Sequence, residues 1–331
     1  MILQNYVLYF TFSNKGDKYY FKHIFRKLKF EQMKVSTEDY ESIVNSLKGQ
    51  LPSLPLVMDE LMTIIADPNA ALYAIKDIIK LDPSIFSQIL KIVNTVQYRG
   101  DGEPKISNLN DAMQRLGLEK VKRIALNTSV LTLFKGIAFP SKFSPESLWI
   151  HSVGVAVTSA SLSEFLNLAI SDQAYSCGLI HDIGKLAKLK FDQQNFCIEL
   201  IKSEESGWNN HQTEVRQNSI RHDLLGGKIA KEWGVAPIIE AVTKWHHEED
   251  RSKRLDVDDS DTHRMIDIVQ FSNEMIKEIE FGYSGHGIKK APSNRIMRRL
   301  KISDDELDEF ENKIAQELDR EKEQISLLGR K

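Results

Sequence analysis

The stretch GLIHDIGKL, residues 178–186, places the pair His181-Asp182 between apolar side chains. A histidine beside an aspartate offers a divalent metal one neutral nitrogen ligand and one anionic oxygen ligand. Such pairs also arise by chance in proteins of this size, so the pair indicates a site only where further ligands accompany it. The candidates for these ligands are His151, His222 and the adjacent His246 and His247.

The residues around the pair predict where its side chains lie. Adjacent residues on a helix point about 100° apart, so His181 and Asp182 reach one metal only if it lies over the wedge between them. Leu179, Ile180 and Ile183 set this wedge against the core, where an unpaired carboxylate is costly. Either a bound cation or a hydrogen bond from a histidine would compensate that charge.

The residues that follow the pair have a functional and a structural interpretation. Lys185, one turn from the cluster, is a candidate for binding phosphate, because its ammonium group complements the charge of a phosphoester. A solvated lysine after a flexible glycine is the alternative, and Gly184 is interpreted as a point of close helix packing. Each flanking histidine, taken alone, is more often a satisfied surface or core residue than a ligand.

The composition favours a soluble helical protein. The chain has 331 residues, of which 41% are hydrophobic and 27% charged, and its net charge of −3 argues against binding nucleic acid through bulk electrostatics. No run of about eighteen apolar residues predicts a membrane-spanning helix, and the apolar N-terminus lacks the basic region of a signal peptide. We expect a cytoplasmic protein with no membrane partner and with Cys177 and Cys197 as free thiols.

Apolar residues recur at helical spacing along most of the chain. Pro55 is placed to open a helix, Asp82-Pro83 is typical of an N-cap followed by proline at the first helical position, and Asn108 or Asn110 is expected to cap the next helix. Further helices are expected near 119–136, 147–166, 172–189, 193–205, 221–233, 263–280 and 303–328, with a polar turn at 207–216 and an acidic loop at 248–262. No stretch alternates strictly enough to predict a strand, so the predicted fold class is all-α.

The motifs resemble those of known families. Residues 147–189 are similar to the core of the HD superfamily of metal-dependent phosphohydrolases. The preceding motifs are LPSLP at 51–55, LDP at 81–83, LKIVN at 90–94 with Tyr98, and AMQRLG at 112–117. They resemble the HDOD domain, an HD-related output domain of bacterial signalling proteins. The resemblance covers roughly residues 45–280 and implies an N-terminal helical subdomain packed on an HD-like helical core.

This resemblance also implies domain boundaries. Residues 1–44 would form an N-terminal extension, 45–140 the helical subdomain, 141–282 the HD-like core and 283–331 a C-terminal amphipathic helix region. The first 32 residues are aromatic and basic, unlike the rest, and are either an extension or the product of a mis-assigned start. The C-terminal helix is expected either to pack on the chain or to form an oligomer seam.

The resemblance further implies a set of metal ligands. Asp182 would bridge the ions in a two-metal site of the kind found in HD-GYP phosphodiesterases of cyclic di-GMP. The matching positions in this chain are His151, His181, Asp182, His222, His246 and His247, with Asn273 at the position of the final aspartate. Asn273 leaves the site one negative charge short, and Asp267 lies two turns from the expected place. The Gly-Tyr-Pro element of HD-GYP enzymes is missing after His247, where residues 248–251 read EEDR.

Two functions of different class follow from this resemblance. The first is a bacterial regulatory module of the HDOD type that binds signalling proteins, and it is favoured by the domain match and by Asn273. The second is a metal-dependent phosphohydrolase or phosphodiesterase acting on a nucleotide or a cyclic dinucleotide, and it is favoured by the retained histidines. In the second case one or two ions of Fe, Mn, Zn or Ni would activate water, with Asp182 and Lys185 as catalytic residues. No direct nucleic-acid partner is expected.

Overall fold

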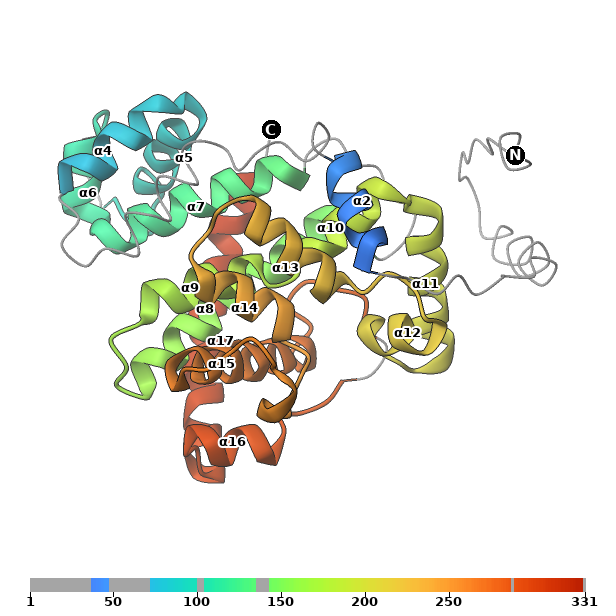
Figure 1. The fold of residues 1–331 in the computed structure, drawn as a ribbon. Coiled ribbons are helices and arrows are strands. Elements are labelled where there is room, and N and C mark those ends of the chain that lie inside the picture. The colour runs from blue at the N-terminus through green and yellow to red at the C-terminus, as the bar shows by residue number, and fades with distance from the viewer. Residues whose placement is uncertain (1–36, 48–71, 100–103, 135–142, 287–288, 330–331) are drawn as a thin grey trace, which may run out of the picture.

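A computed structural model describes residues 37–47, 72–99, 104–134, 143–286 and 289–329 (Figure 1). Residues 1–32 and the helix expected after Pro55 lie outside the described residues. Within them every regular element is a helix, apart from an isolated antiparallel bridge between Asn209 and His286. The predicted all-α class is therefore confirmed.

The helices fall into two groups along the chain. The first comprises α2 (Thr37–Leu47), α4 (Leu72–Leu81), α5 (Pro83–Val93), α6 (Leu109–Leu116) and α7 (Leu118–Phe134). The second begins with α8 (Pro145–Phe165), α9 (Ser171–Ile180), α10 (Ile183–Phe191), α11 (Gln193–Ser206) and α12 (Asn210–Gln217). It continues with α13 (His222–Glu232), α14 (Pro237–Trp245), the short 3₁₀ helix η1 (Arg251–Lys253), α15 (Ser260–Glu278), α16 (Asn294–Leu300) and α17 (Asp304–Gly329).

The capping residues predicted for the first group are confirmed. The Asp82 carboxylate accepts hydrogen bonds from the backbone N–H groups of Ser84 and Ile85, and the side chain of Asn108 accepts one from the N–H of Asp111. Asn94 ties the end of α5 to the following loop, because its amide donates to the carbonyl of Ile106 and accepts from the same residue's N–H. These bonds fix the ends of α5 and α6 beside α7.

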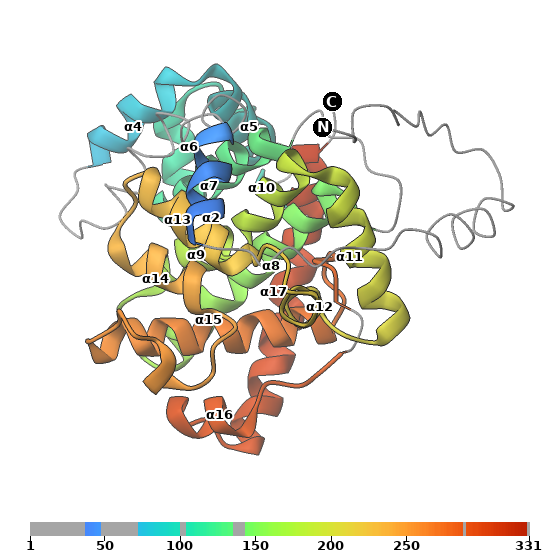
Figure 2. The ribbon, with the colours of Figure 1, turned by 45° about the vertical axis from the view of Figure 1, so that its right-hand side comes forward.

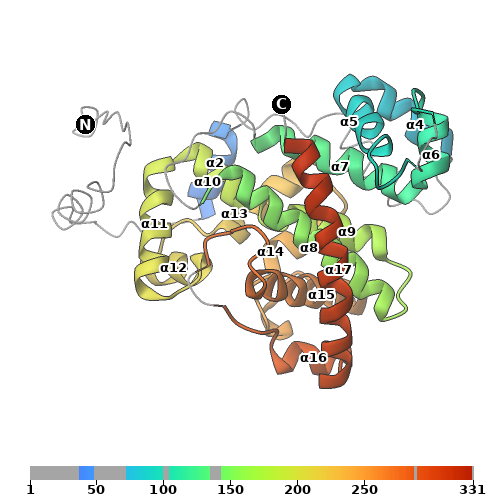
Figure 3. The same ribbon diagram turned by 180° about the vertical axis from the view of Figure 1, so that it is seen from behind.

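Helix α8 forms the centre of the second group. It is buried on nearly all sides and packs against α9, α15 and α17, as the view from behind shows for α17 (Figure 3). The apolar stripe of α17 is covered within the chain, since Phe310, Ile314 and Leu318 are each no more than 2% exposed. The expectation of a packed C-terminal helix is confirmed. On another face, α2 lies over α10 and α13 (Figure 2).

Residues 172–189 are two helices rather than the single helix predicted. Helix α9 ends at Ile180 and α10 begins at Ile183, so His181 and Asp182 occupy the junction. The apolar pattern continues across this break and hides it from a periodicity argument. Because the pair lies between two helices, the angular restriction of 100° between its side chains does not apply.

Other features of the second group also differ from the prediction. The segment 207–216, predicted as a turn, contains α12, which a capping box between Asn209 and Gln212 opens despite its polar sequence. Helix α8 begins at Pro145, two residues before the expected start at 147, so His151 lies in its second turn. His246 and His247 follow the end of α14. The acidic loop at 248–262 holds η1 and the first residues of α15.

Gly184 brings α10 against the start of α13, which confirms its interpretation as a packing position. A Cβ atom there would lie 1.9 Å from the backbone oxygen of His222. We expect Gly184→Ala to destabilise the fold by about 1–3 kcal/mol or more, because the obstacle is backbone and cannot rotate away. Gly117→Ala is the control: its φ of +80° strains an alanine, but no atom lies within 4 Å of the new Cβ. Urea unfolding in which Gly184→Ala costs no more than the control would contradict this account.

Candidate metal centre

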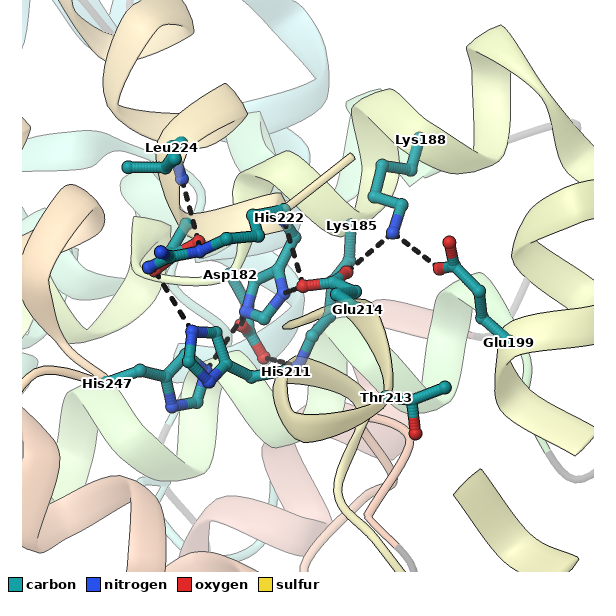
Figure 4. Close-up of polar contacts among 12 residues, drawn as sticks. Asp182, Lys185, Lys188, Glu199, His211, Thr213, Glu214, His222, Leu224 and His247 are labelled. Atoms are coloured by element: carbon teal, nitrogen blue, oxygen red, sulfur yellow. Dashed lines mark hydrogen bonds and ion pairs between the residues drawn. The ribbon is translucent and has the colours of Figure 1, made fainter. Parts of the chain in front are cut away.

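The structure brings together all seven residues predicted as ligands. They come from five places: α8 (His151), the α9–α10 junction (His181, Asp182), the start of α13 (His222), the end of α14 (His246, His247) and α15 (Asn273). His247 is half-buried and the others are buried. Figure 4 shows Asp182 between His222 and Lys185.

The Asp182 carboxylate lies at the middle of this cluster. Its Oδ1 lies 3.2 Å from Nε2 of His222 and 3.5 Å from Nε2 of His246. Its Oδ2 lies 3.4 Å from Nε2 of His181, 3.9 Å from Nε2 of His151 and 2.7 Å from Nζ of Lys185. Each carboxylate oxygen therefore faces a different set of histidines. The two groups whose ligand atoms lie within 4.8 Å of one another are Asp182, His222, His246 and His247 on one side, and His151, His181 and Asp182 on the other.

Hydrogen bonds at the far side of three rings fix their tautomers. Nδ1 of His181 donates to the carbonyl of Gly178 at 2.7 Å, and Nδ1 of His246 donates to the carbonyl of Thr243 at 2.8 Å. Nδ1 of His222 donates to a carboxylate oxygen of Glu214, also at 2.7 Å. Carbonyl and carboxylate oxygens can only accept, so the proton of each neutral ring is on Nδ1 and a lone pair is on Nε2.

These lone pairs point at oxygen atoms that also carry lone pairs. Nε2 of His181, Nε2 of His246 and Oδ1 of Asp182 are buried and have no hydrogen-bond partner among the described residues. Such an arrangement is unfavourable unless a positive charge lies between the nitrogen and oxygen atoms. The residues present therefore fit a divalent metal on each side of Asp182.

The electrostatic environment favours an ionised Asp182 and neutral rings at His246, His151 and His247. His222 differs, because burial would lower its pKa but the Glu214 carboxylate outweighs burial and raises it. Burial alone would raise the pKa of Asp182, but Lys185 and His181 outweigh it and hold this pKa well below the ordinary value. Burial lowers the pKa of His246 to about 3, and it lowers that of His151 and His247 well below the usual range. An ionised carboxylate and neutral imidazoles are the forms that bind metals.

Asn273 and Asp267 occupy different environments on α15. The Oδ1 of Asn273 lies 3.1 Å from Nε2 of His151, so the amide takes part in the cluster. Asp267 faces away from it, and its carboxylate is bound by Arg251, Arg254 and Arg299. Asp267 is therefore part of a buried ion network and does not replace the missing aspartate.

A chain of buried charges that the sequence did not predict supports His222. Glu214 accepts from both Nδ1 and the backbone N–H of His222 and is bound in turn by Nζ of Lys188 at 2.6 Å (Figure 4). Lys188 also contacts Glu199. Burial would raise the pKa of Glu214, but His222 and Lys188 lower it to about 2. The carboxylate stays ionised and orients the ring.

His211 and Asp223 form a second arrangement that the sequence did not predict. The ring of His211, on α12, stacks on His247 with centroids 4.4 Å apart. Its Nε2 lies 3.4 Å from a carboxylate oxygen of the buried Asp223, which Arg221 also binds. A capping pattern formed by Asn209, two residues before His211, and Gln212, directly after it, is the sequence signal that could have indicated this helix.

Comparison with known proteins identifies the family. The model of the HDOD domain family matches residues 51–249, more than half of the chain. The chain therefore belongs to the HDOD domain family, and the predicted class of HDOD-type signal-transduction module is confirmed.

Curated relatives match only in part. An uncharacterised protein of Treponema pallidum is 22% identical over 204 residues, which are 60% of this chain and 37% of that protein. Ribonuclease Y of Mycoplasma capricolum is 24% identical over 168 residues, which are 50% of this chain and 27% of that enzyme. The chain thus aligns with well under half of each of these relatives.

Solved structures share the fold. An HDOD domain protein of unknown function from Geobacter sulfurreducens is 22% identical with a TM-score of 0.67, over 88% of this chain and 98% of that one. A proposed signal transduction protein from Marinobacter aquaeolei VT8 is 16% identical with a TM-score of 0.69, over 88% and 66%. A proposed phosphohydrolase from Shewanella amazonensis SB2B is 16% identical with a TM-score of 0.59, over 87% and 97%. No helix of the described residues is long and apolar enough to cross a membrane.

The buried contact between Glu214 and His222 predicts an effect on metal affinity. We expect Glu214→Gln to weaken metal binding about 10–100-fold, because the amide orients the ring less strongly and does not raise its basicity. Competition against a chromophoric chelator measures this change. Glu204→Gln is a matched control on the surface, where Glu204 accepts a hydrogen bond from Tyr283. Equal affinities for the two variants would show that Glu214 does not support the centre.

Proposed function

We propose that this HDOD-family module holds two divalent transition-metal ions on either side of Asp182. One ion would be bound by His151, His181 and Asp182, and the other by Asp182, His222, His246 and His247. The observation that supports this proposal is that Nε2 of His181 and Nε2 of His246 have no hydrogen-bond partner among the described residues and face one ionised carboxylate, with their protons fixed on Nδ1. Nε2 of His222 lies 3.2 Å from the same carboxylate. Fe, Mn, Zn and Ni all suit imidazole with carboxylate ligands.

In this proposal the metals are part of a regulatory module that binds signalling proteins through its helical surface. Loss of the ions would leave buried lone pairs facing one another and would loosen the junctions at which five elements meet. The occupancy of the centre would thereby change the shape or stability of the surface that partners contact.

The test is metal content by plasma mass spectrometry on protein purified without a histidine tag, followed by chelation. The proposal expects close to two equivalents of metal, and a melting temperature that falls on chelation and recovers when the metal returns. His246→Gln should retain the ion on the His151 side. His263→Gln, at a histidine outside the cluster, is the matched control. A folded, metal-free protein whose melting temperature does not change when metal is added would refute the proposal.

A second candidate function is a metal-dependent phosphohydrolase acting on a nucleotide or a cyclic dinucleotide. It is favoured by Lys185, whose buried ammonium lies 2.7 Å from the bridging carboxylate and can complement a phosphoester there. Bound metals would supply Lewis acidity for the attack of water. His247 and His211 are only partly buried and mark the side from which a substrate would reach the centre.

Hydrolysis of bis(p-nitrophenyl) phosphate, a cyclic dinucleotide and a single-stranded RNA by the metal-loaded protein tests this second function. The RNA is included because part of the chain aligns with ribonuclease Y. Lys185→Met should keep the metals and lower kcat by about 10²–10³. Absence of turnover on all three substrates would leave the regulatory module alone.

Replacing Asn273 with aspartate is predicted to increase the affinity of the site for metal. We expect Asn273→Asp to bind metal about tenfold more tightly on the His151 side, which corresponds to about 1.4 kcal/mol, because a carboxylate replaces a neutral amide next to Nε2 of His151. Titration with Mn²⁺ followed by calorimetry measures this gain. Unchanged or weaker binding would show that residue 273 does not contribute a ligand.

A further inference from the structure

A second group of buried polar side chains lies beside the metal centre, between α12 and the segment 281–286. Asn210 is 2% exposed, Ser284 is 1% exposed and His286 is 9% exposed. Both amide atoms of Asn210, the hydroxyl of Ser284 and Nδ1 of His286 lack a hydrogen-bond partner among the described residues. Buried polar groups are nearly always paired, so this concentration indicates a missing ligand or trapped water.

The backbone holds these side chains in place. The N–H of Asn210 donates to the carbonyl of Gly285 at 2.9 Å, next to the bridge between Asn209 and His286. Gly285 has a φ of +82°, and a Cβ atom there would lie 3.4 Å from Cβ of Asn210 and 2.5 Å from Leu200. Asn210 therefore packs directly against the glycine that separates Ser284 from His286. Backbone hydrogen bonds and close packing therefore hold the unpaired side chains in place.

The charges of Lys277 and Lys185 act on His286 more strongly than those of Glu280 and Asp182. The ring of His286 lies 6.3 Å from that of His151. Lys277, one turn beyond Asn273 on α15, is only 3% exposed, and it forms a long ion pair of 3.5 Å with Glu274. Burial, and then the charges of Lys277 and Lys185, lower the pKa of His286 to about 4. Two buried ammonium groups thus act on the ring.

We propose that Asn210, Ser284 and His286, together with Lys277, bind a phosphoryl group beside the metal centre. The Asn210 amide, the Ser284 hydroxyl and a ring N–H of His286 can donate to phosphate oxygens, and Lys277 supplies compensating charge. This site depends on the proposed function for its role. It would hold one phosphate of a nucleotide while the metals act on the neighbouring phosphate.

The experiment is calorimetric titration of the full chain with inorganic phosphate and, separately, with a nucleoside monophosphate. Ser284→Ala removes one hydroxyl, Asn210→Asp keeps the shape but adds a negative charge, and Lys277→Met removes a cation. The matched control is Lys228→Met on α13, where the lysine pairs with Glu41 at the surface. We expect Kd for phosphate to rise at least tenfold in the three site variants and to stay unchanged in the control.

The two titrants, inorganic phosphate and a nucleoside monophosphate, distinguish the possible ligands of this site. Tighter binding of the monophosphate than of inorganic phosphate would assign the site to nucleotides, and equal binding would assign it to free phosphate. Wild-type affinity in all three site variants would place phosphate on the metals alone and overturn the proposal, as would absence of phosphate binding. Metal content is measured on the same samples. Phosphate binding that needs Ser284 in a metal-free protein would support this site while refuting the metal centre.

Discussion

Asp182→Asn is expected to reduce the metal content from close to two equivalents to nearly none. Asp182 is the one residue that belongs to both groups of ligands, and each of its oxygens faces a separate set of histidines. An asparagine of the same shape offers one neutral oxygen and an amide that repels cations. His246→Gln, by contrast, removes a ligand from one group only and should cost about one equivalent. Plasma mass spectrometry on both variants measures the difference.

The control for this experiment addresses folding. Lys185 is 1% exposed and its ammonium is bound by Asp182, so loss of the carboxylate leaves a buried charge unpaired. The double variant Asp182→Asn/Lys185→Met removes both charges and should recover stability without recovering metal. If Asp182→Asn keeps two equivalents while remaining folded, the bridging role is wrong.

Asp267→Asn is expected to cause the largest loss of stability among single polar substitutions. The carboxylate of Asp267 is fully buried and accepts hydrogen bonds from Arg254 at 2.8 Å and from Arg299 at 2.8 Å, while Arg251 lies at 2.6 Å. Arg254 is itself buried, and removing its partner leaves an uncompensated charge, which costs about 3–5 kcal/mol. Urea unfolding in excess chelator measures this loss without a contribution from metal.

Asp261→Asn is the matched control for Asp267→Asn, because Asp261 is 83% exposed and its pair with Arg264 spans 3.6 Å. A surface pair of this kind contributes little, about 0–1 kcal/mol. Equal losses in the two variants would contradict the account of the buried network.

The stabilisation of the fold by Asp267 is expected to depend on pH. Burial would raise the pKa of Asp267, but hydrogen bonds from Arg299 and Arg254 outweigh it and lower this pKa. A carboxylate with a lowered folded pKa stabilises the fold fully above its unfolded pKa of about 3.9, and this stabilisation is lost as the pH falls through the folded pKa. The difference between wild type and Asp267→Asn should therefore shrink only in acid.

Local patterns in the sequence were sufficient to predict most of the helices. Asp82-Pro83 and Asn108 carry their structural meaning within a few residues, and the structure confirms both caps. The break between α9 and α10 could not be predicted, because apolar residues continue across His181 and Asp182. Helix α12 was missed since its polar sequence shows no apolar stripe, although the Asn209–Gln212 capping box marked its start.

The residues of the candidate site were likewise predicted only in part. The histidines and Asp182 were predicted from family motifs, and the structure brings them together, but their use as metal ligands remains a proposal. Glu214, Asn210 and His286 had no such motif, since each acts through a contact with a residue in another element. The side-chain tautomers, which provide the physical case for a cation, depend on carbonyl groups that only the folded chain places beside the rings.

Anomalous diffraction from crystals of the metal-loaded protein tests the two-metal centre most directly. Data collected on either side of the absorption edge of the bound metal would locate the ions without assumptions about stoichiometry. We predict two peaks on opposite sides of the Asp182 carboxylate, one beside His151 and His181 and the other beside His222 and His246. A metal peak elsewhere, or a single ion with Asp182 bound only by Lys185, would contradict the bridging arrangement.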